Sequence, residues 1–237
     1  MYSKPQKRIE CIDALRGLCV ILMVLHHFMY DLVEFLNAPE WLFTNPILDV
    51  LHYIFAGCFI FLSGLSSRFS RSNVRRGLKA AIIALIITLV TWYMDMIILF
   101  GVLHFLAFSM IFYGFTAKFW ERLPHRAAPA IYIALIAGTA ILTSRLSPVQ
   151  ADWLWPLGFV TRDFYSADYF PILPWIFVFL LGAWFGGIVR SGRLPERFYT
   201  ARFKFLPPIG RRALIVYVLH QPVLYGITLL IGEIIKK

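Results

Sequence analysis

The stretch DALRGLCVILMVLHHFMYDL, residues 13–32, combines an apolar helical pattern with charged and titratable side chains. Its length fits a membrane crossing, because about 20 apolar residues span the hydrocarbon core of a bilayer. Five ionisable residues interrupt it, namely Asp13, Arg16, His26, His27 and Asp31. A charge at the centre of a membrane helix costs about 2.5–3.5 kcal/mol on insertion scales, so such residues are functional candidates. The stretch therefore predicts a membrane helix with a functional polar face.

Helical geometry places most of these groups on one face. Successive residues advance about 100°, so with Arg16 at 0° His27 lies near 20°. By the same step Asp13 and Asp31 lie near 60°, and His26 lies about 80° to the other side. We expect the aligned groups to line a cavity inside the protein. Two alternatives remain open: Asp13 and Arg16 form a local ion pair near the helix end, and His27 is a packing histidine.

The whole chain has the composition of an all-α membrane protein. Hydrophobic residues make up 59% of its 237 residues and charged residues 15%, whereas soluble domains carry about 25% charged residues. We expect residues 1–237 to form a single integral-membrane domain, a polytopic bundle of about seven transmembrane helices. The predicted spans are 12–36, 46–67, 77–98, 100–119, 127–145, 170–190 and 211–234.

Basic residues are distributed unevenly between the predicted loops. Alternate segments, 4–8, 68–79, 118–126 and 190–212, hold 18 of the 23 Lys and Arg residues, and the other loops and the carboxyl terminus hold four. Cytoplasmic loops carry the excess of Lys and Arg, so the pattern predicts the amino terminus inside and the carboxyl terminus outside. The formal net charge of +10 is explained by this topology, and we do not expect a nucleic-acid partner.

Further polar residues lie within the later predicted spans. His52 and His104 are expected in outer halves of their helices, level with His26 and His27. In the last span, His220 and Gln221 precede Pro222, which is expected to break the helix and expose carbonyl groups to a cavity. For each histidine the alternative is an interhelical hydrogen bond.

Small residues and cysteines give weaker signals. The stretch FLSGLS, residues 61–66, favours close helix packing through small residues, and Ser63 as a hydrogen-bond donor to a thioester oxygen is the alternative. The three cysteines have neither disulfide nor zinc spacing, so we expect no metal.

The chain resembles known membrane acyltransferases in its motifs. Arg16 and His27 stand ten residues apart, which is similar to the Arg-x10-His helix of the family that O-acetylates bacterial glycans. A longer resemblance is to the short bacterial members of the heparan-α-glucosaminide N-acetyltransferase catalytic-domain family. The motifs that carry it are RIECIDALRGLCVILMVLHHFMYDL (8–32), FAGCFIFLSGLSSRFSRSNVRRGLK (55–79), FGVLHFLAFSM (100–110), YFPILPWIFVFLLGAWFGG (169–187) and YVLHQPVLYG (217–226).

The resemblance implies transfer of an acetyl group from cytoplasmic acetyl-CoA, by a multi-pass protein of the cell membrane, to a hydroxyl or amine of an external glycan or glycolipid. His27 is expected to act as general base with Asp31 orienting its ring. Substrate contacts are expected from His26, His52, His104, His220, Gln221 and Ser63. The residues expected to hold CoA are Arg16, Asp13, Arg75, Arg76 and Arg211.

Several points remain open at this stage. Direct transfer is favoured over a covalent acyl-histidine intermediate. A proton-coupled transporter would use intramembrane His and Asp equally well, and histidines on separate helices can also be axial ligands of haem. The expected partners are membrane lipid, acyl-CoA and the acceptor, and the sequence is compatible with a homodimer.

Overall fold

The computed structural model describes residues 8–235, which are helical with irregular connections. Helices account for 75% of the structure, and no strand occurs in the described range. The contacts divide the chain into two compact units. The terminal unit ends at Phe59 and resumes at Leu194, and the central unit is Ile60–Arg193. Lys4, Lys7, Lys236 and Lys237, which the topology prediction counts, lie outside the described residues.

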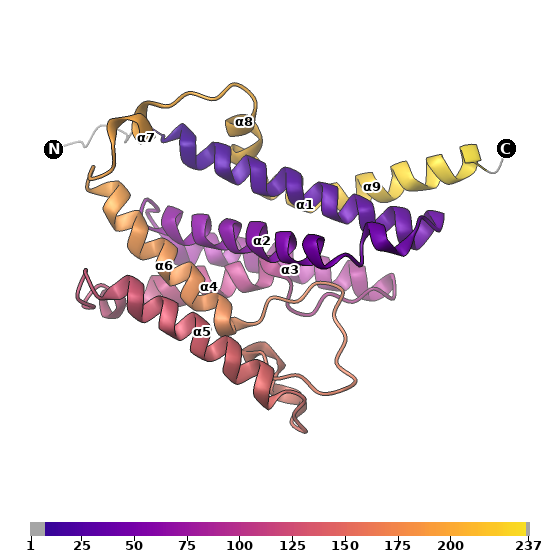
Figure 1. Cartoon of the computed structure of the whole chain (residues 1–237), viewed down its shortest axis with the longest axis horizontal. Coiled ribbons are helices and arrows are strands. Elements are labelled where there is room, and N and C mark those ends of the chain that lie inside the picture. Colours follow the sequence, from indigo (N-terminus) through magenta and orange to yellow (C-terminus); the bar gives the residue numbers. More distant parts are fainter. Residues whose placement is uncertain (1–7, 236–237) are drawn as a thin grey trace. The chain divides into compact units, whose positions relative to one another are not determined.

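The terminal unit is built around the first helix. Its elements are α1 (Glu10–Leu36), the 3-10 helix η1 (Glu40–Leu42), the first part of α2 (Pro46–Ser67), α7 (Glu196–Thr200), α8 (Leu206–Arg211) and α9 (Ala213–Ile235). Figure 1 shows α8 beside the amino-terminal half of α1 and α9 beside its carboxyl-terminal half. At the α1–α8 contact, a Cβ added to Gly210 would overlap the carbonyl oxygen of Asp13. This glycine therefore permits direct backbone contact.

The central unit pairs its helices through similar close approaches. It contains the end of α2, α3 (Asn73–Tyr93), α4 (Val102–Trp120), α5 (Ala128–Leu146), the 3-10 helix η2 (Asp152–Leu157) and α6 (Ile172–Arg190). Helices α3 and α4 pack together, as do α5 and α6. A Cβ on Gly64 would overlap the carbonyl oxygen of Phe179, and a Cβ on Gly182 would overlap that of Phe61. The α2–α6 contact thus supports the packing interpretation of the small residues at 61–66.

The segment between α3 and α4 corrects a sequence prediction. The predicted spans 77–98 and 100–119 leave one residue between them, but α3 ends at Tyr93 and the connection pairs with the loop before α6. Phe170 N–H donates to Phe100 carbonyl oxygen at 2.8 Å. Asp168 Oδ2 accepts from Val102 N–H at 3.0 Å and so caps α4. The apolar pattern did not show this, because the partners lie more than 60 residues apart.

A hydrogen bond holds the loop before α6 to the 3-10 helix η2. Tyr169 O–H donates to the carbonyl oxygen of Trp155. Burial raises the pKa of Tyr169 to about 12, so this hydroxyl stays protonated and keeps donating at physiological pH.

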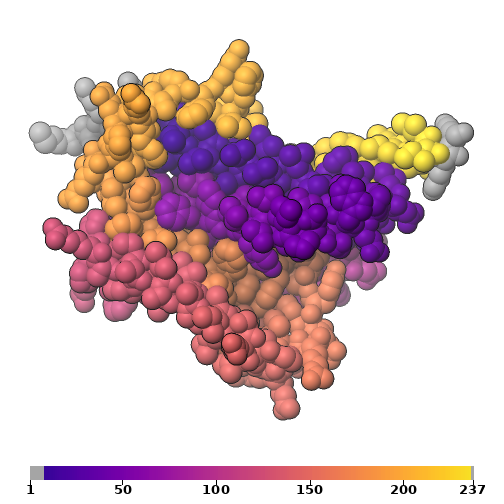
Figure 2. Space-filling model, in the orientation of Figure 1, coloured from indigo at the N-terminus to yellow at the C-terminus, as the bar shows by residue number. Residues whose placement is uncertain are grey.

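Six helical segments within residues 8–235 are long and apolar enough to cross a membrane: α1, Glu40–Ser67, α4, α5, α6 and α9. They match six of the seven predicted spans. The remaining one corresponds to α3, which begins earlier than expected and carries basic residues in its first turns. Figure 2 shows α5 along the surface of the central unit, where Ile133 and Ile141 are 58% and 60% exposed. Such apolar exposure fits contact with lipid.

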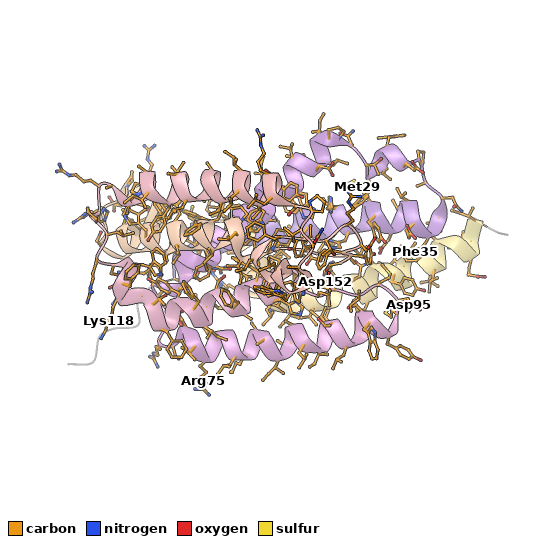
Figure 3. All side chains as sticks on the ribbon, turned by 90° about the horizontal axis from the view of Figure 1, so that it is seen from below. Met29, Phe35, Arg75, Asp95, Lys118 and Asp152 are labelled. Carbon is orange, nitrogen blue, oxygen red and sulfur yellow. The ribbon has the colours of Figure 1, made fainter. Side chains whose placement is uncertain are left out.

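Two basic residues and two acidic residues of the central unit lie toward its opposite ends. Figure 3 shows Arg75 and Lys118 toward one end of this unit, and Asp95 and Asp152 toward the other. The segment 190–212, expected as a loop, also holds the short helices α7 and α8.

Candidate active site

Three charged residues meet where α1 begins and α8 ends. Asp13 is buried, and its Oδ1 lies 3.0 Å from Arg16 Nη1. Its Oδ2 lies 3.3 Å from Arg211 Nε. The local ion pair foreseen as an alternative is therefore present, and Arg211 extends it across helices. We call Asp13, Arg16 and Arg211 the Asp13 cluster.

A second carboxylate continues the Asp13 cluster toward α7. Glu10 Oε1 lies 2.7 Å from Arg202 Nη1 and 3.9 Å from Arg211 Nη2. Glu10 Oε2 also accepts from the backbone N–H of Phe203 at 3.3 Å. The segment between α7 and α8 is thereby held to the first turn of α1. Glu10 and Arg202 were not among the predicted site residues, because the sequence does not show which loop residues return to α1.

Two of the residues expected to hold CoA lie elsewhere. Arg75 and Arg76 are exposed in the first turn of α3, which belongs to the central unit. The structure therefore brings Asp13, Arg16 and Arg211 together in the terminal unit, whereas Arg75 and Arg76 belong to the central unit.

Further along α1, two histidines face each other. The ring centroids of His27 and His220 lie 4.8 Å apart with planes at 79°. His27 Nδ1 lies 2.9 Å from Met23 carbonyl oxygen, and His220 Nδ1 lies 2.6 Å from the carbonyl oxygen of Tyr217. A carbonyl can only accept, so both Nδ1 atoms carry a proton. In the neutral rings, both Nε2 atoms then have a free lone pair.

A carboxylate and an amide adjoin this histidine pair. Gln221 Nε2 donates to Asp31 Oδ1 at 2.7 Å, and Asp31 is fully buried. His27 Nδ1 bonds to the carbonyl of Met23, one turn earlier, and Asp31 bonds to Gln221, so orientation of the His27 ring by Asp31 stays a prediction. We call His27, Asp31, His220 and Gln221 the α1–α9 cluster.

Helix α9 runs without a break through the α1–α9 cluster. It extends from Ala213 to Ile235 with Pro222 inside, so the predicted interruption at Pro222 is wrong. Proline lacks an N–H and leaves the carbonyl of Val218 without its helical partner. Helix α9 nevertheless continues past Pro222 and packs along α1.

The neighbouring histidine of α1 faces a different helix, as its helical angle predicts. His52 Nδ1 lies 3.3 Å from His26 Nε2, and the two ring centroids are 4.4 Å apart. Phe43 also packs on His26, with centroids 4.9 Å apart. His26 and His52 thus form an interhelical hydrogen bond between α1 and α2.

The last two predicted residues lie in the central unit. Thr88 O–H donates to Ile98 carbonyl oxygen at 2.6 Å, so its oxygen accepts from His104 Nε2 at 2.9 Å. Ser63 lies beside Gly64 in the α2–α6 contact, and its carbonyl accepts from Ser67 O–H at 3.1 Å. Both are explained by structural roles within the unit.

One further cluster of the central unit was not predicted. Arg68, directly after α2, donates to Tyr113 at 3.1 Å and forms an ion pair with Glu121. Arg190 donates to the carbonyl of Arg68 at 3.2 Å. These contacts join the ends of α2, α4 and α6. A single sequence shows the basic residues but not the tyrosine and carboxylate that pair with them.

The fold and the buried polar face of α1 place the protein in the class of multi-pass membrane proteins that carry ionisable groups between packed helices. The family profile described as "Heparan-alpha-glucosaminide N-acetyltransferase, catalytic" matches residues 8–222. The chain belongs to this family, which implies an acetyltransferase enzyme. The expected family is thereby confirmed. Searches of curated proteins and of solved structures gave no match.

Proposed function

We propose that this protein transfers an acetyl group from cytoplasmic acetyl-CoA to a hydroxyl or amine of an external glycan or glycolipid. The observation that carries the proposal is the α1–α9 cluster, where two histidines present lone pairs beside a buried carboxylate. A family of acetyltransferases requires a group that takes a proton from the acceptor, and these imidazoles can supply it.

The Asp13 cluster is the proposed site for the anionic part of CoA. Arginine guanidinium groups bind phosphate oxygens through paired N–H donors. Arg16 and Arg211 both contact Asp13, and Arg202 and Arg211 both contact Glu10, so three cationic groups face two carboxylates there. The remaining positive charge suits a phosphate.

The spacing along α1 matches a long, narrow donor. Arg16 and His27 are eleven residues apart, so they are separated by roughly 16 Å along the helix axis. The pantetheine arm would extend over this distance from the Asp13 cluster to the α1–α9 cluster. Both clusters lie on the face of α1 that α8 and α9 cover.

The chemical step is proposed as direct transfer. The acceptor oxygen or nitrogen attacks the thioester carbonyl carbon, and His27 Nε2 takes the proton that the acceptor loses. The carbon–sulfur bond then breaks, and the thiolate leaves with the electron pair and regains a proton from the imidazolium. The products are the acetylated acceptor and free CoA thiol.

The proposed membrane topology has seven spans, with the amino terminus in the cytoplasm. Helix α3 has 21 residues, which is long enough to span about 30 Å. The separation of Arg75 and Lys118 from Asp95 and Asp152 along the central unit supports this orientation. Donor entry from the cytoplasm follows from it, since the Asp13 cluster lies at the amino-terminal end of α1.

The rate of acetyl transfer by the His27→Ala variant tests the proposal, and the His26→Ala variant is the matched control. Purified protein in lipid nanodiscs would be supplied with acetyl-CoA and a membrane extract as acceptor, and release of CoA thiol measured. We expect His27→Ala to lose at least 100-fold in rate, as removal of a general base does, and His26→Ala to lose less, because His26 contacts α2. Full turnover by His27→Ala, with normal folding, would exclude His27 from the chemistry.

A further inference from the structure

Helix α3 buries one side and leaves the other side open. Gly77, Ala80 and Ala84 are buried, and a Cβ added to Gly77 would overlap the carbonyl oxygen of Ala107 in α4. The opposite side of α3 carries large apolar side chains that are more than half exposed. They are Leu78, Ile82, Ile86 and Leu89. This side of the helix is therefore available to lipid.

Two basic residues continue the open side of α3 toward its amino-terminal end. Successive helical residues advance about 100°, so with Arg75 at 0° Lys79 lies near 40°. By the same step Ile82 lies near 340° and Ile86 near 20°. Arg75 and Lys79 are both exposed, and Figure 3 shows Arg75 directed away from the other helices. We call Arg75, Lys79 and the four exposed apolar residues the open α3 face.

The charges of Arg75 and Lys79 are not neutralised within the described part of the chain. The ion pairs found there involve other residues. Arg68, a few residues earlier, pairs with Glu121, but no Asp or Glu occurs in residues 50–94. The first turns of α3 therefore keep their positive charge and suit an anionic partner.

The length of the apolar part of this face fits one lipid leaflet. Lys79 and Leu89 are ten residues apart, so they are separated by roughly 15 Å along the helix axis. The hydrocarbon core of a bilayer is about 30 Å thick, and one leaflet supplies about half of it. The acyl chains of a single phospholipid can thus cover the apolar residues while its headgroup reaches the two cations.

We propose that the open α3 face binds a phospholipid of net negative charge. Phosphate oxygens contact Arg75 and Lys79, since guanidinium and ammonium groups both bind phosphate. Basic residues next to a membrane helix attract anionic headgroups, whereas a zwitterionic headgroup would bring its own cation to the site. The apolar residues favour a lipid over a soluble phosphate compound such as CoA, which has no acyl chains to cover Ile82 and Ile86.

Competition between two lipids tests the proposal. The purified full chain in a phosphate-free detergent would be mixed with equal amounts of phosphatidylglycerol and phosphatidylcholine, and the bound lipids counted by native mass spectrometry. We expect the wild-type protein to prefer phosphatidylglycerol about tenfold, because each basic residue adds to the attraction. The double variant Arg75→Gln/Lys79→Gln is expected to bind the two lipids equally.

The matched control is Arg122→Gln/Arg126→Gln, which removes the same charge from exposed positions before α5. We expect this variant to keep the preference, and circular dichroism checks that both variants are folded. The proposal would be overturned by a wild-type protein without preference, or by equal loss in both double variants, which would indicate an effect of net charge alone. Displacement of bound phosphatidylglycerol by CoA would overturn it too, because the site would then hold a soluble phosphate compound.

Discussion

His27 and His220 are oriented by the backbone of their own helices. Each Nδ1 bonds to a carbonyl three or four residues earlier, and the two ring centroids lie 4.8 Å apart in an edge-to-face arrangement. This arrangement fixes the tautomer without a carboxylate, so Asp31 remains available for other partners. At the other end of α1, Asp13 instead holds two arginines in place. The same helix face thus offers cationic donors at one end and hydrogen-bond acceptors further along.

Substitution of Arg16 is predicted to weaken donor binding. In Arg16→Gln the Asp13 cluster loses one of its two guanidinium groups, and we expect the Kd for CoA to rise about tenfold, equivalent to about 1.4 kcal/mol. Isothermal titration with the purified protein measures this. The control is Arg145→Gln at the exposed end of α5, which we expect to bind CoA normally. Equal affinity in both variants would remove Arg16 from the donor site.

The helices are joined by glycine contacts that leave no room for a side chain. Gly64 and Gly182 bring the backbones of α2 and α6 together, and Gly210 does the same for α8 and α1. Between membrane helices, where hydrophobic driving force is weak, such close packing is a main source of association. Other glycines, such as Gly138 and Gly226, would place a Cβ in open space.

Alanine substitutions separate these two kinds of glycine. Gly64→Ala forces α2 away from α6 and is predicted to destabilise the protein by about 1–3 kcal/mol. Gly138→Ala meets no atom within 4 Å and is predicted to be neutral or slightly stabilising, since alanine favours the helix. Thermal unfolding in detergent gives the comparison. If both variants unfolded at the same temperature, the close α2–α6 contact would not matter to stability.

The loop before α6 is predicted to stabilise α4 through a single carboxylate. Asp168→Ala removes the acceptor for the Val102 N–H, and loss of such a cap costs about 1 kcal/mol. Asp163→Ala, at an exposed position of the same loop, serves as the matched change. Hydrogen exchange of the first turn of α4 reports the effect. Faster exchange in Asp168→Ala alone is expected, and equal exchange in both variants would show that the cap is unnecessary.

Across the whole molecule, the apolar segments and the distribution of basic residues predict seven spans. The amino and carboxyl termini are then expected on opposite sides of the membrane. Fusion of alkaline phosphatase or a fluorescent protein to the carboxyl terminus tests this. The phosphatase fusion is expected to be active and the fluorescent fusion dark, because the proposed topology puts the carboxyl terminus outside. A fluorescent fusion with inactive phosphatase would mean an even number of spans or the opposite orientation.

The number and approximate positions of the long helices could be predicted, because span length and apolar composition are local properties. Helix α2 begins and ends at the expected residues, whereas α3 begins at Asn73 because Ser72 Oγ accepts from Arg75 N–H at 3.2 Å. The residues that share one face of α1 could be predicted from the advance of about 100° per residue in a helix. The partners of that face could not be predicted, since pairing of His27 with His220 depends on which helices pack together.

The central claim is that CoA extends along α1 from the Asp13 cluster to His27. A structure of the full chain determined with CoA bound tests this most directly. We predict phosphate oxygens in contact with Arg16 and the thiol sulfur within about 4 Å of His27 Nε2, close enough for reaction and proton transfer. A CoA whose phosphates lie away from Arg16, or whose sulfur does not approach His27, would contradict the account.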